Sequence, residues 1–176
     1  MSKIRLGLVG CGGMGHRHLY GLAELHRAGL CRFEPVVACD PRKENAESLA
    51  KHIEQHFGIR PAIVGSLDEV STADLQAVDI CTDPRHHHTI CADAASRRWD
   101  VMTEKPMGLT VRACRIMREA TDSAGRILSV AENYRRDPIN RLGKALLDAG
   151  VIGAPRYMVH NTAGGENKMM TVSYTH

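Results

Sequence analysis

The sequence predicts an α/β protein with a doubly wound parallel sheet, and three observations support this prediction. Short apolar runs typical of buried strands alternate six times with longer stretches typical of helices. The connections are short, which is typical of strand–helix units whose strands lie parallel. Aromatic residues make up only 4% of the chain, which suits an Ala-, Val- and Ile-rich α/β core better than an all-β sandwich.

Each strand and helix is indicated by its own local pattern. We expect strands at residues 3–10, 34–39, 61–64, 78–82, 100–103 and 127–132. We expect helices at residues 14–28, 43–57, 86–97, 110–125 and 138–149, and a further helix start at residues 66–69. The helix at 43–57 carries apolar residues at the i, i+3, i+4, i+7 spacing of one helical face.

Several helix ends are marked by residues that suit the first or last turn. The expected starts are Ser66 with Glu69 in a capping box, Thr110, and Asp137 followed by Pro138. The expected stops are Gly125 and Gly150. In the last helix we expect a buried apolar stripe made of Ile139, Leu142, Leu146 and Ala149.

The pattern of elements also predicts where domains divide. Residues 1–125 are expected to form the domain core, and residues 126–150 to complete it with a last strand and helix. The pattern changes from residue 151, where residues 155–162 indicate a single strand of a new unit. We therefore expect residues 151–176 to be the truncated start of a second α/β domain.

Composition disfavours several classes of function. The net charge is +3 and the charged residues are interspersed, so the sequence gives no support for nucleic-acid binding. No apolar run approaches the roughly 18 residues of a membrane span. The first residues enter a strand at once, so we expect no signal peptide and a cytoplasmic location.

Six cysteines are dispersed along the chain and form no C-x-x-C pair. This pattern predicts reduced thiols rather than a disulfide framework. Cys11 is a special case, because a position near a helix N-terminus can lower a thiol pKa. The simpler alternative is that Cys11 is there because it is small.

A glycine-rich turn follows the first predicted strand and precedes the first predicted helix. Its sequence, Gly10-Cys11-Gly12-Gly13-Met14-Gly15, fits G-x-G-x-x-G in the context where that motif indicates dinucleotide binding. The helix N-terminus would offer N–H groups and a positive dipole end to a pyrophosphate. We expect Gly10, Gly12, Gly13, Met14 and Gly15 to bind the cofactor, and the alternative is a tight turn that binds nothing.

An acidic residue, Asp40, ends the second predicted strand at about the spacing of a ribose-binding carboxylate. A carboxylate there accepts hydrogen bonds from ribose hydroxyls and repels a 2′-phosphate, which favours NAD. Arg42 and Lys43 follow closely and would favour NADP if they held that phosphate. NAD is the prediction, and NADP remains possible.

Two further strand ends carry polar residues that suggest chemistry. Glu104, Lys105 and Pro106 follow the strand at 100–103, and Lys105 could donate a hydrogen bond to a substrate oxygen. Tyr134 and Arg135 follow the last strand and are candidate substrate contacts. The alternatives are a surface strand end and a polar loop.

Three adjacent histidines follow Pro84, at positions 86, 87 and 88. Adjacent side chains on a helix point in different directions, so we expect no metal site there. A helix start that packs on the cofactor side is the better interpretation.

Together these segments resemble the glucose–fructose oxidoreductase / inositol dehydrogenase / MocA (Gfo/Idh/MocA) family over about residues 3–160. The resemblance rests on the glycine-rich turn with His18, on Asp40, on Thr82-Asp83-Pro84 with His88, on Glu104-Lys105-Pro106, and on residues 135–138 followed by 150–153. The Glu-Lys-Pro sequence is the most specific of these features.

The resemblance implies a Rossmann domain followed by an α/β domain with a mostly antiparallel sheet that covers the nicotinamide and mediates oligomers. It implies hydride transfer between NAD(P) and a hydroxyl or carbonyl carbon of a sugar, polyol or related small molecule. Lys105 matches the family's active-site lysine, and the bond between Lys105 and Pro106 is expected to be cis. The resemblance also places Thr82, Pro84, His88 and Glu104 on the cofactor side.

One departure from the family is serious. Family members typically exceed 300 residues and carry an Asp-x-x-x-His motif in the second domain, and we find no such motif here. Turnover by the 176 residues alone is therefore doubtful, because a general acid/base must reach the proton it transfers. The alternatives are a non-catalytic nucleotide-binding module, and a relative that uses a transient oxidation within a hydrolytic or isomerising cycle.

Overall fold

The computed structural model describes residues 3–71 and 74–159. The chain divides into two compact units, one ending at Glu132 and one beginning at Asn133. The expected completion of the first domain by residues 126–150 thus differs from this division, because only the strand of that segment belongs to the first unit. The domain boundaries themselves stay a prediction.

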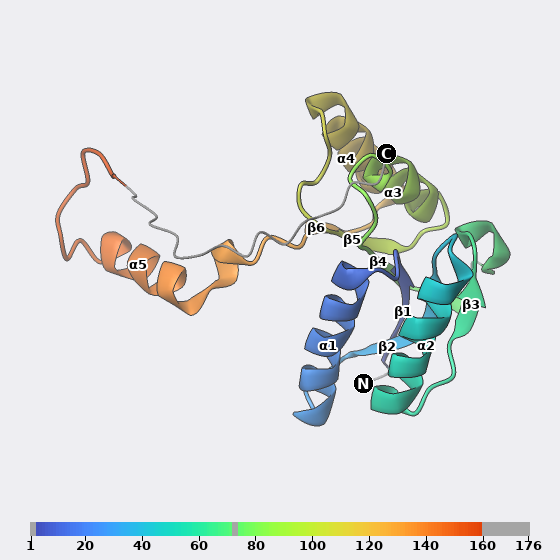
Figure 1. The fold of residues 1–176 in the computed structure, drawn as a ribbon. Coiled ribbons are helices and arrows are strands. Elements are labelled where there is room, and N and C mark those ends of the chain that lie inside the picture. The colour runs from blue at the N-terminus through green and yellow to red at the C-terminus, as the bar shows by residue number, and fades with distance from the viewer. Residues whose placement is uncertain (1–2, 72–73, 160–176) are drawn as a thin grey trace. The chain divides into compact units, whose positions relative to one another are not determined.

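The first unit is built on a six-stranded parallel sheet of order β3-β2-β1-β4-β5-β6. Its strands are β1 (Ile4–Val9), β2 (Phe33–Cys39), β3 (Ala62–Val64), β4 (Ala77–Ile80), β5 (Asp100–Thr103) and β6 (Leu128–Val130). The order reverses between β1 and β4, so the chain moves outward in opposite directions from the centre (Figure 1). The predicted doubly wound parallel fold is confirmed.

Helices cover both faces of this sheet (Figure 1). The helices of the unit are α1 (Gly13–Arg27), α2 (Lys43–Phe57), α3 (His87–Ser96), α4 (Val111–Ala124) and the short 3₁₀ helix η1 (Leu67–Glu69). The side chains of α1 and α2 share one core cluster with Leu6 and Leu8, whereas Cys91 of α3 and Met117 of α4 share the other with Val9. This separation follows from the period-two alternation of side chains along β1.

Local capping signals are largely confirmed. Thr110 accepts a 3.1 Å hydrogen bond from the backbone N–H of Ala113, and Gly125 ends helix α4 in the left-handed region. Glu69 Oε1 accepts from the N–H of Ser66 at 3.0 Å, but the helix that follows is only the three-residue η1. A capping box thus marks the start of a helix but does not determine how long the helix is.

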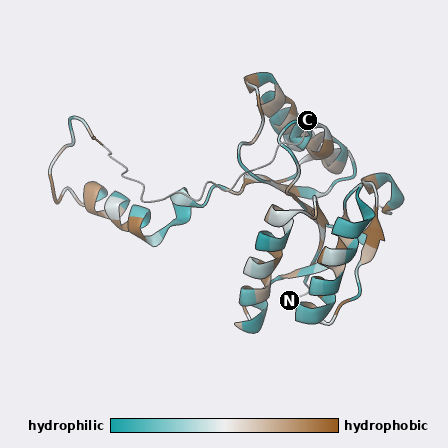
Figure 2. Cartoon of the chain, in the orientation of Figure 1, coloured by the Kyte–Doolittle hydropathy of each residue, from teal (hydrophilic) through white to brown (hydrophobic). Residues whose placement is uncertain are grey.

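The second unit contains the 3₁₀ helix η3 (Tyr134–Arg136) and helix α5 (Pro138–Asp148). Asp137 caps α5 by accepting a hydrogen bond from Ile139 N–H at 3.1 Å, as predicted. The predicted burial of its apolar stripe is wrong, since Ile139, Leu142 and Leu146 are exposed. Figure 2 shows apolar and polar residues side by side on this helix. An amphipathic pattern predicts a helix but does not show which surface would cover its apolar side.

Two other expectations concern the end of the chain and the membrane. The strand predicted at 155–162 is absent from residues 155–159, and residues 160–162 lie outside the described part. Within the described ranges, no helix combines the length and apolarity that crossing a membrane requires.

Candidate functional site

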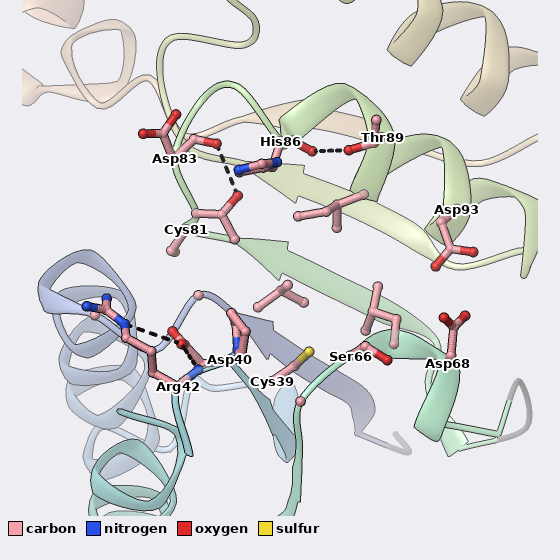
Figure 3. A pocket seen from close by; sticks show the side chains of 18 residues that line it. Cys39, Asp40, Arg42, Ser66, Asp68, Cys81, Asp83, His86, Thr89 and Asp93 are labelled. Atoms are coloured by element: carbon pink, nitrogen blue, oxygen red, sulfur yellow. Dashed lines mark hydrogen bonds and ion pairs between the residues drawn. The ribbon is translucent and has the colours of Figure 1, made fainter. Parts of the chain in front are cut away.

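A pocket of about 650 Å³ lies at the carboxyl ends of the central strands (Figure 3). Its walls come from the ends of β1, β2 and β4, from η1, and from the first part of α3. This is where the strand order reverses, the position at which open α/β sheets bind ligands. The pocket therefore lies beside the glycine-rich turn and Asp40, which the sequence predicts to bind the cofactor.

The glycine-rich turn forms one wall of this pocket through Gly10 and Gly12. Gly10 has φ +91°, and a Cβ there would lie 2.7 Å from the carbonyl carbon of Cys81. At Gly15, a Cβ would lie 2.3 Å from the Gly10 carbonyl oxygen, so α1 can approach β1 only because this residue is glycine. Helix α1 begins at Gly13 with Gly12 as its N-cap, and Gly12 has no side chain to cover the first-turn N–H groups.

Asp40 lies beside this turn and is buried at the end of β2. Its Oδ2 accepts a 2.8 Å hydrogen bond from the N–H of Cys11, and its Oδ1 accepts one of 2.9 Å from the N–H of Arg42. The exposed Arg42 guanidinium lies 3.9 Å from Oδ1 at its Nε atom. Both residues line the pocket, with the fixed carboxylate on its floor and the guanidinium toward solvent (Figure 3).

The thiol of Cys11 does not have the reactive environment that its sequence position suggested. Burial raises its pKa to about 12, and the neighbouring Asp40 and Cys39 add to this effect. The suggested lowering of its pKa is therefore wrong, because burial disfavours the charged thiolate, and the simpler alternative that Cys11 is there because it is small is the better interpretation. All six cysteines are free thiols, as predicted.

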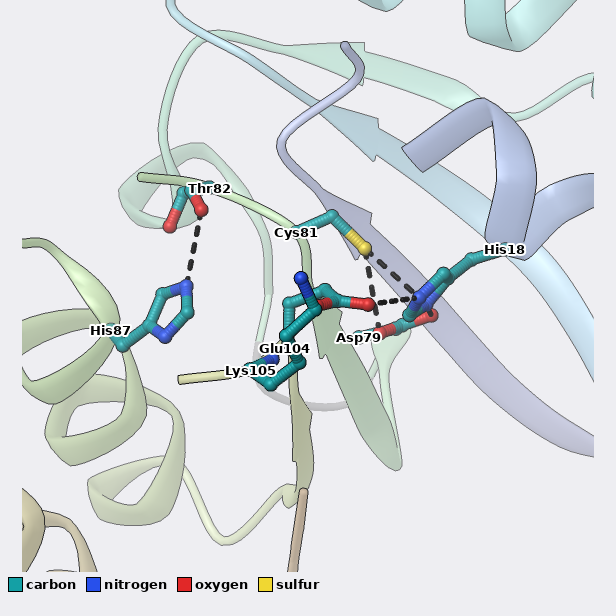
Figure 4. Close-up of polar contacts among 7 residues, drawn as sticks. All are labelled: His18, Asp79, Cys81, Thr82, His87, Glu104 and Lys105. Carbon is teal, nitrogen blue, oxygen red and sulfur yellow. Dashed lines mark hydrogen bonds and ion pairs between the residues drawn. The ribbon is translucent and has the colours of Figure 1, made fainter. Parts of the chain in front are cut away.

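A hydrogen-bonded chain of side chains lies at the ends of β4 and β5 (Figure 4). His18, on α1, places Nδ1 2.8 Å from Asp79 Oδ2 and Nε2 3.1 Å from Glu104 Oε1. The other oxygen of Glu104, Oε2, accepts a 2.8 Å hydrogen bond from the N–H of Lys105. This chain connects a helix, a central strand and the Glu-Lys-Pro turn.

The charge state of His18 follows from its surroundings. The hydrogen bond to Asp79 raises the pKa of His18 to about 9; burial opposes this shift, and Glu104 adds to it. Cys81 completes the cluster, with Sγ 3.4 Å from Nδ1 of His18. Potential metal-ligand atoms of His18, Asp79 and Cys81 all lie within 4.8 Å of one another, and both ring nitrogens of His18 contact carboxylate oxygens.

Lys105 is exposed at the carboxyl end of β5, directly after the buried Glu104. The peptide bond between Lys105 and Pro106 is cis, as expected. Pro106 accepts a hydrogen bond at its carbonyl oxygen from Nδ1 of His87, 3.1 Å away, and Nε2 of His87 lies 3.1 Å from the carbonyl oxygen of Thr82. His87 thus connects the turn that carries Lys105 to the segment that follows β4.

Among the three adjacent histidines, the structure buries His87, whereas the sequence singled out His88. His88 and Pro84 line a separate pocket with Leu109 and Thr110, and the structure does not bring them to the glycine-rich turn. Thr82 does line the main pocket. Gly13, Met14 and Gly15 are not among the residues lining that pocket, although they form the first turn of α1 beside it.

The sequence patterns did not single out several residues of the site, namely Asp79, His87 and the pocket residues Asp68, Thr89 and Asp93. Asp79 is a fully buried carboxylate inside the apolar strand Ala77–Ile80, and a charged residue in such a strand was an available signal. His87 had no such signal, because three neighbouring histidines look alike in sequence. Tyr134 and Arg135 lie in η3 of the second unit, and their role as substrate contacts stays a prediction.

The comparison with known families decides the identity of this arrangement. A family model described as an oxidoreductase family with an NAD-binding Rossmann fold, Gfo/Idh/MocA, matches residues 4–132. The chain belongs to the Gfo/Idh/MocA family. The resemblance inferred from the sequence is confirmed.

Individual relatives agree with this assignment. The chain is 31% identical to D-apiose dehydrogenase of Paraburkholderia graminis over 156 residues, which cover 88% of this chain and 39% of that protein. It is 31% identical to inositol 2-dehydrogenase of Burkholderia ambifaria over 160 residues, covering 89% of this chain and 44% of that protein. The chain therefore spans about two-fifths of the length of these relatives.

Solved structures agree as well. The WlbA dehydrogenase of Bordetella pertussis in complex with NADH and UDP-GlcNAcA matches with a TM-score of 0.69 and 29% identity, over 84% of this chain and 42% of that one. An oxidoreductase of Thermotoga maritima matches with a TM-score of 0.74 and 28% identity, over 86% and 44%. Both matches likewise cover less than half of the known chain.

Proposed function

We propose that this chain is the cofactor-binding part of an NAD-dependent dehydrogenase. The enzyme would transfer a hydride between the nicotinamide and a hydroxyl or carbonyl carbon of a sugar, a polyol or a related small molecule. The observation that carries the proposal is the pairing of Asp40 with the glycine-rich turn in one pocket, with Lys105 at the neighbouring strand end. When bound, NAD supplies the hydride chemistry, and the chain binds and orients it.

The choice of NAD over NADP is argued from Asp40. Its carboxylate is buried, is fixed by two backbone N–H groups, and belongs to a residue that lines the pocket. Such a group accepts from ribose hydroxyls and repels a 2′-phosphate. Arg42 supports the second candidate, NADP, because its exposed guanidinium lies beside Asp40 in the same pocket and could pair with a 2′-phosphate.

Lys105 is the proposed catalytic residue. Its ammonium group would donate a hydrogen bond to the reacting oxygen of the substrate and stabilise negative charge there as the hydride leaves or arrives. Thr82, Glu104 and the glycine-rich turn would hold the cofactor side, and Tyr134 and Arg135 the substrate side. We place the general acid/base outside the first unit, in a second domain of the kind that the relatives' greater length leaves room for.

The cellular setting is part of the same proposal. Six free thiols are consistent with a reducing compartment, so we propose a cytoplasmic location. We further propose that the full-length protein forms a homo-oligomer and binds neither nucleic acid nor membranes.

The test is a titration of the purified chain with NADH and NADPH, followed by nicotinamide fluorescence, and then an assay of the full-length protein with a panel of polyols and sugars. Saturable binding of NADH and reduction of NAD by one class of polyol would support the proposal. In the active protein, Lys105→Ala should lower kcat by about a hundredfold or more, with Lys144→Ala as a control on an exposed lysine of α5. NADH binding without turnover of any compound would instead favour the non-catalytic nucleotide-binding module, and no binding at all would overturn both.

A further inference from the structure

We propose that His18 is a positioning residue for Lys105, acting through Glu104. The inference rests on the proposed function, because it concerns how the proposed catalytic lysine is held. It is carried by one continuous series of contacts from the buried Asp79 to the backbone of Lys105 (Figure 4).

The geometry gives His18 two simultaneous roles. Both of its ring nitrogens lie within hydrogen-bond distance of carboxylate oxygens, and a carboxylate oxygen only accepts. The ring must therefore donate from both nitrogens, as an imidazolium does. Hydrogen bonds in which both partners are charged are the stronger ones, so the bridge fixes the rotamer of Glu104.

The groups that face this ring come from the carboxyl ends of two neighbouring strands, β4 and β5. Asp79 and Cys81 belong to β4 and its carboxyl end, Glu104 follows β5, and His18 itself projects from the second turn of α1. Asp79 is fully buried and Glu104 nearly so, so two adjacent carboxylates would repel each other strongly without a cation between them. His18 lies between the two carboxylates and contacts both of them, and Glu104 in turn contacts the Lys105 N–H.

The position of Glu104 affects where the Lys105 side chain lies. Glu104 Oε2 accepts a hydrogen bond from the Lys105 N–H, and the Pro106 carbonyl oxygen accepts one from Nδ1 of His87. The direction in which the Lys105 side chain leaves the sheet edge is set by these backbone contacts. A misplaced lysine would lower kcat without weakening the contacts that the glycine-rich turn makes with the cofactor.

The test compares two amide replacements of His18 in the complete chain. A glutamine amide nitrogen lies near the position of Nε2 and can still donate toward Glu104, whereas an asparagine amide nitrogen lies near Nδ1 and serves only Asp79. We expect amide hydrogen exchange at Lys105, measured by NMR, to be roughly tenfold faster in His18→Asn and less accelerated in His18→Gln. His16→Gln is the matched control. It also removes a histidine of α1, but the His16 ring packs against His52 and not against Asp79 or Glu104.

The outcomes separate this inference from the proposed function. We expect kcat in the active protein to fall about tenfold in His18→Asn. Unchanged exchange at Lys105 in a folded His18→Asn chain would overturn the inference even if NADH binds. Failure of the unmodified chain to bind NADH would overturn the proposed function, whatever the exchange rates. If His18→Asn does not fold, Asp79→Ala removes the acceptor of His18 Nδ1 and must also speed exchange at Lys105.

Discussion

The backbone N–H of Cys11 donates a 2.8 Å hydrogen bond to Oδ2 of Asp40, so the carboxylate at the end of β2 also holds the glycine-rich turn. Asp40 therefore has two roles that substitution can separate. One is to fix the turn, which needs only an acceptor oxygen. The other is to repel a 2′-phosphate, which needs the negative charge.

Asp40→Asn should keep the first role and lose the second. We expect NADH binding to weaken by roughly tenfold and NADPH binding to strengthen, because the amide still accepts from Cys11 N–H but no longer repels phosphate. Fluorescence titrations with both nucleotides measure the ratio of dissociation constants. An unchanged ratio would show that Asp40 does not select the cofactor. Asp40→Ala serves as the comparison, since it removes both roles and should also lower the free energy of unfolding.

Gly15 and Gly21 lie on the same helix and should respond to alanine in opposite directions. Gly15→Ala places a Cβ 2.3 Å from the Gly10 carbonyl oxygen, so we expect it to destabilise the fold by about 2 kcal/mol or more. No atom lies within 4 Å of a Cβ at the exposed Gly21, so Gly21→Ala should stabilise the fold by about 0.5–1 kcal/mol. Urea unfolding of both variants checks the pair, and equal effects would contradict the packing argument.

Stability should fall at alkaline pH because of His18. Its pKa is raised from 6.5 to about 9, so the contribution is fully present below about pH 6.5 and is lost as pH rises through about 9. The shift corresponds to at most about 3 kcal/mol. Urea unfolding at about pH 6 and about pH 10 should show a larger loss for the unmodified chain than for His18→Gln. Parallel losses in the two proteins would rule out His18 as the source.

Thiol reactivity should follow burial rather than position in the glycine-rich turn. Burial raises the pKa of Cys11 and of Cys39 to about 12, and that of Cys91 to about 11. We expect iodoacetamide to label the partly exposed Cys31 and Cys114 at least about tenfold faster than Cys11 in the folded chain. Mass spectrometry of the labelled peptides gives the order. Labelling of Cys11 first would contradict the description of its surroundings.

Much of the fold could be predicted because its signals are local. The helix at 43–57 and the strand at 100–103 have the predicted bounds, since apolar periodicity and flanking turn residues are both written in neighbouring positions. The expectations that failed needed knowledge of a partner surface. Ile139, Leu142 and Leu146 have the spacing of a buried stripe, yet they are exposed on α5.

Some residues of the candidate site could likewise be predicted from local sequence, and others could not. Gly10, Asp40 and Lys105 could be located from sequence, because each stands at the end of a predicted strand with a residue type suited to its chemistry. The choice between His87 and His88 could not, because it depends on which side of α3 faces the Pro106 carbonyl group.

The alternation of strands and helices, the glycine-rich turn and the acidic end of β2 could be predicted from the residues alone, because each depends on a few consecutive positions. The contacts of His18 with Asp79, 61 residues away, and with Glu104, 86 residues away, arise only in the folded unit. Such pairs depend on the order of strands in the sheet and on the depth at which α1 packs against it. Those quantities are set by the packing of the whole unit, so no local pattern of residues specifies them.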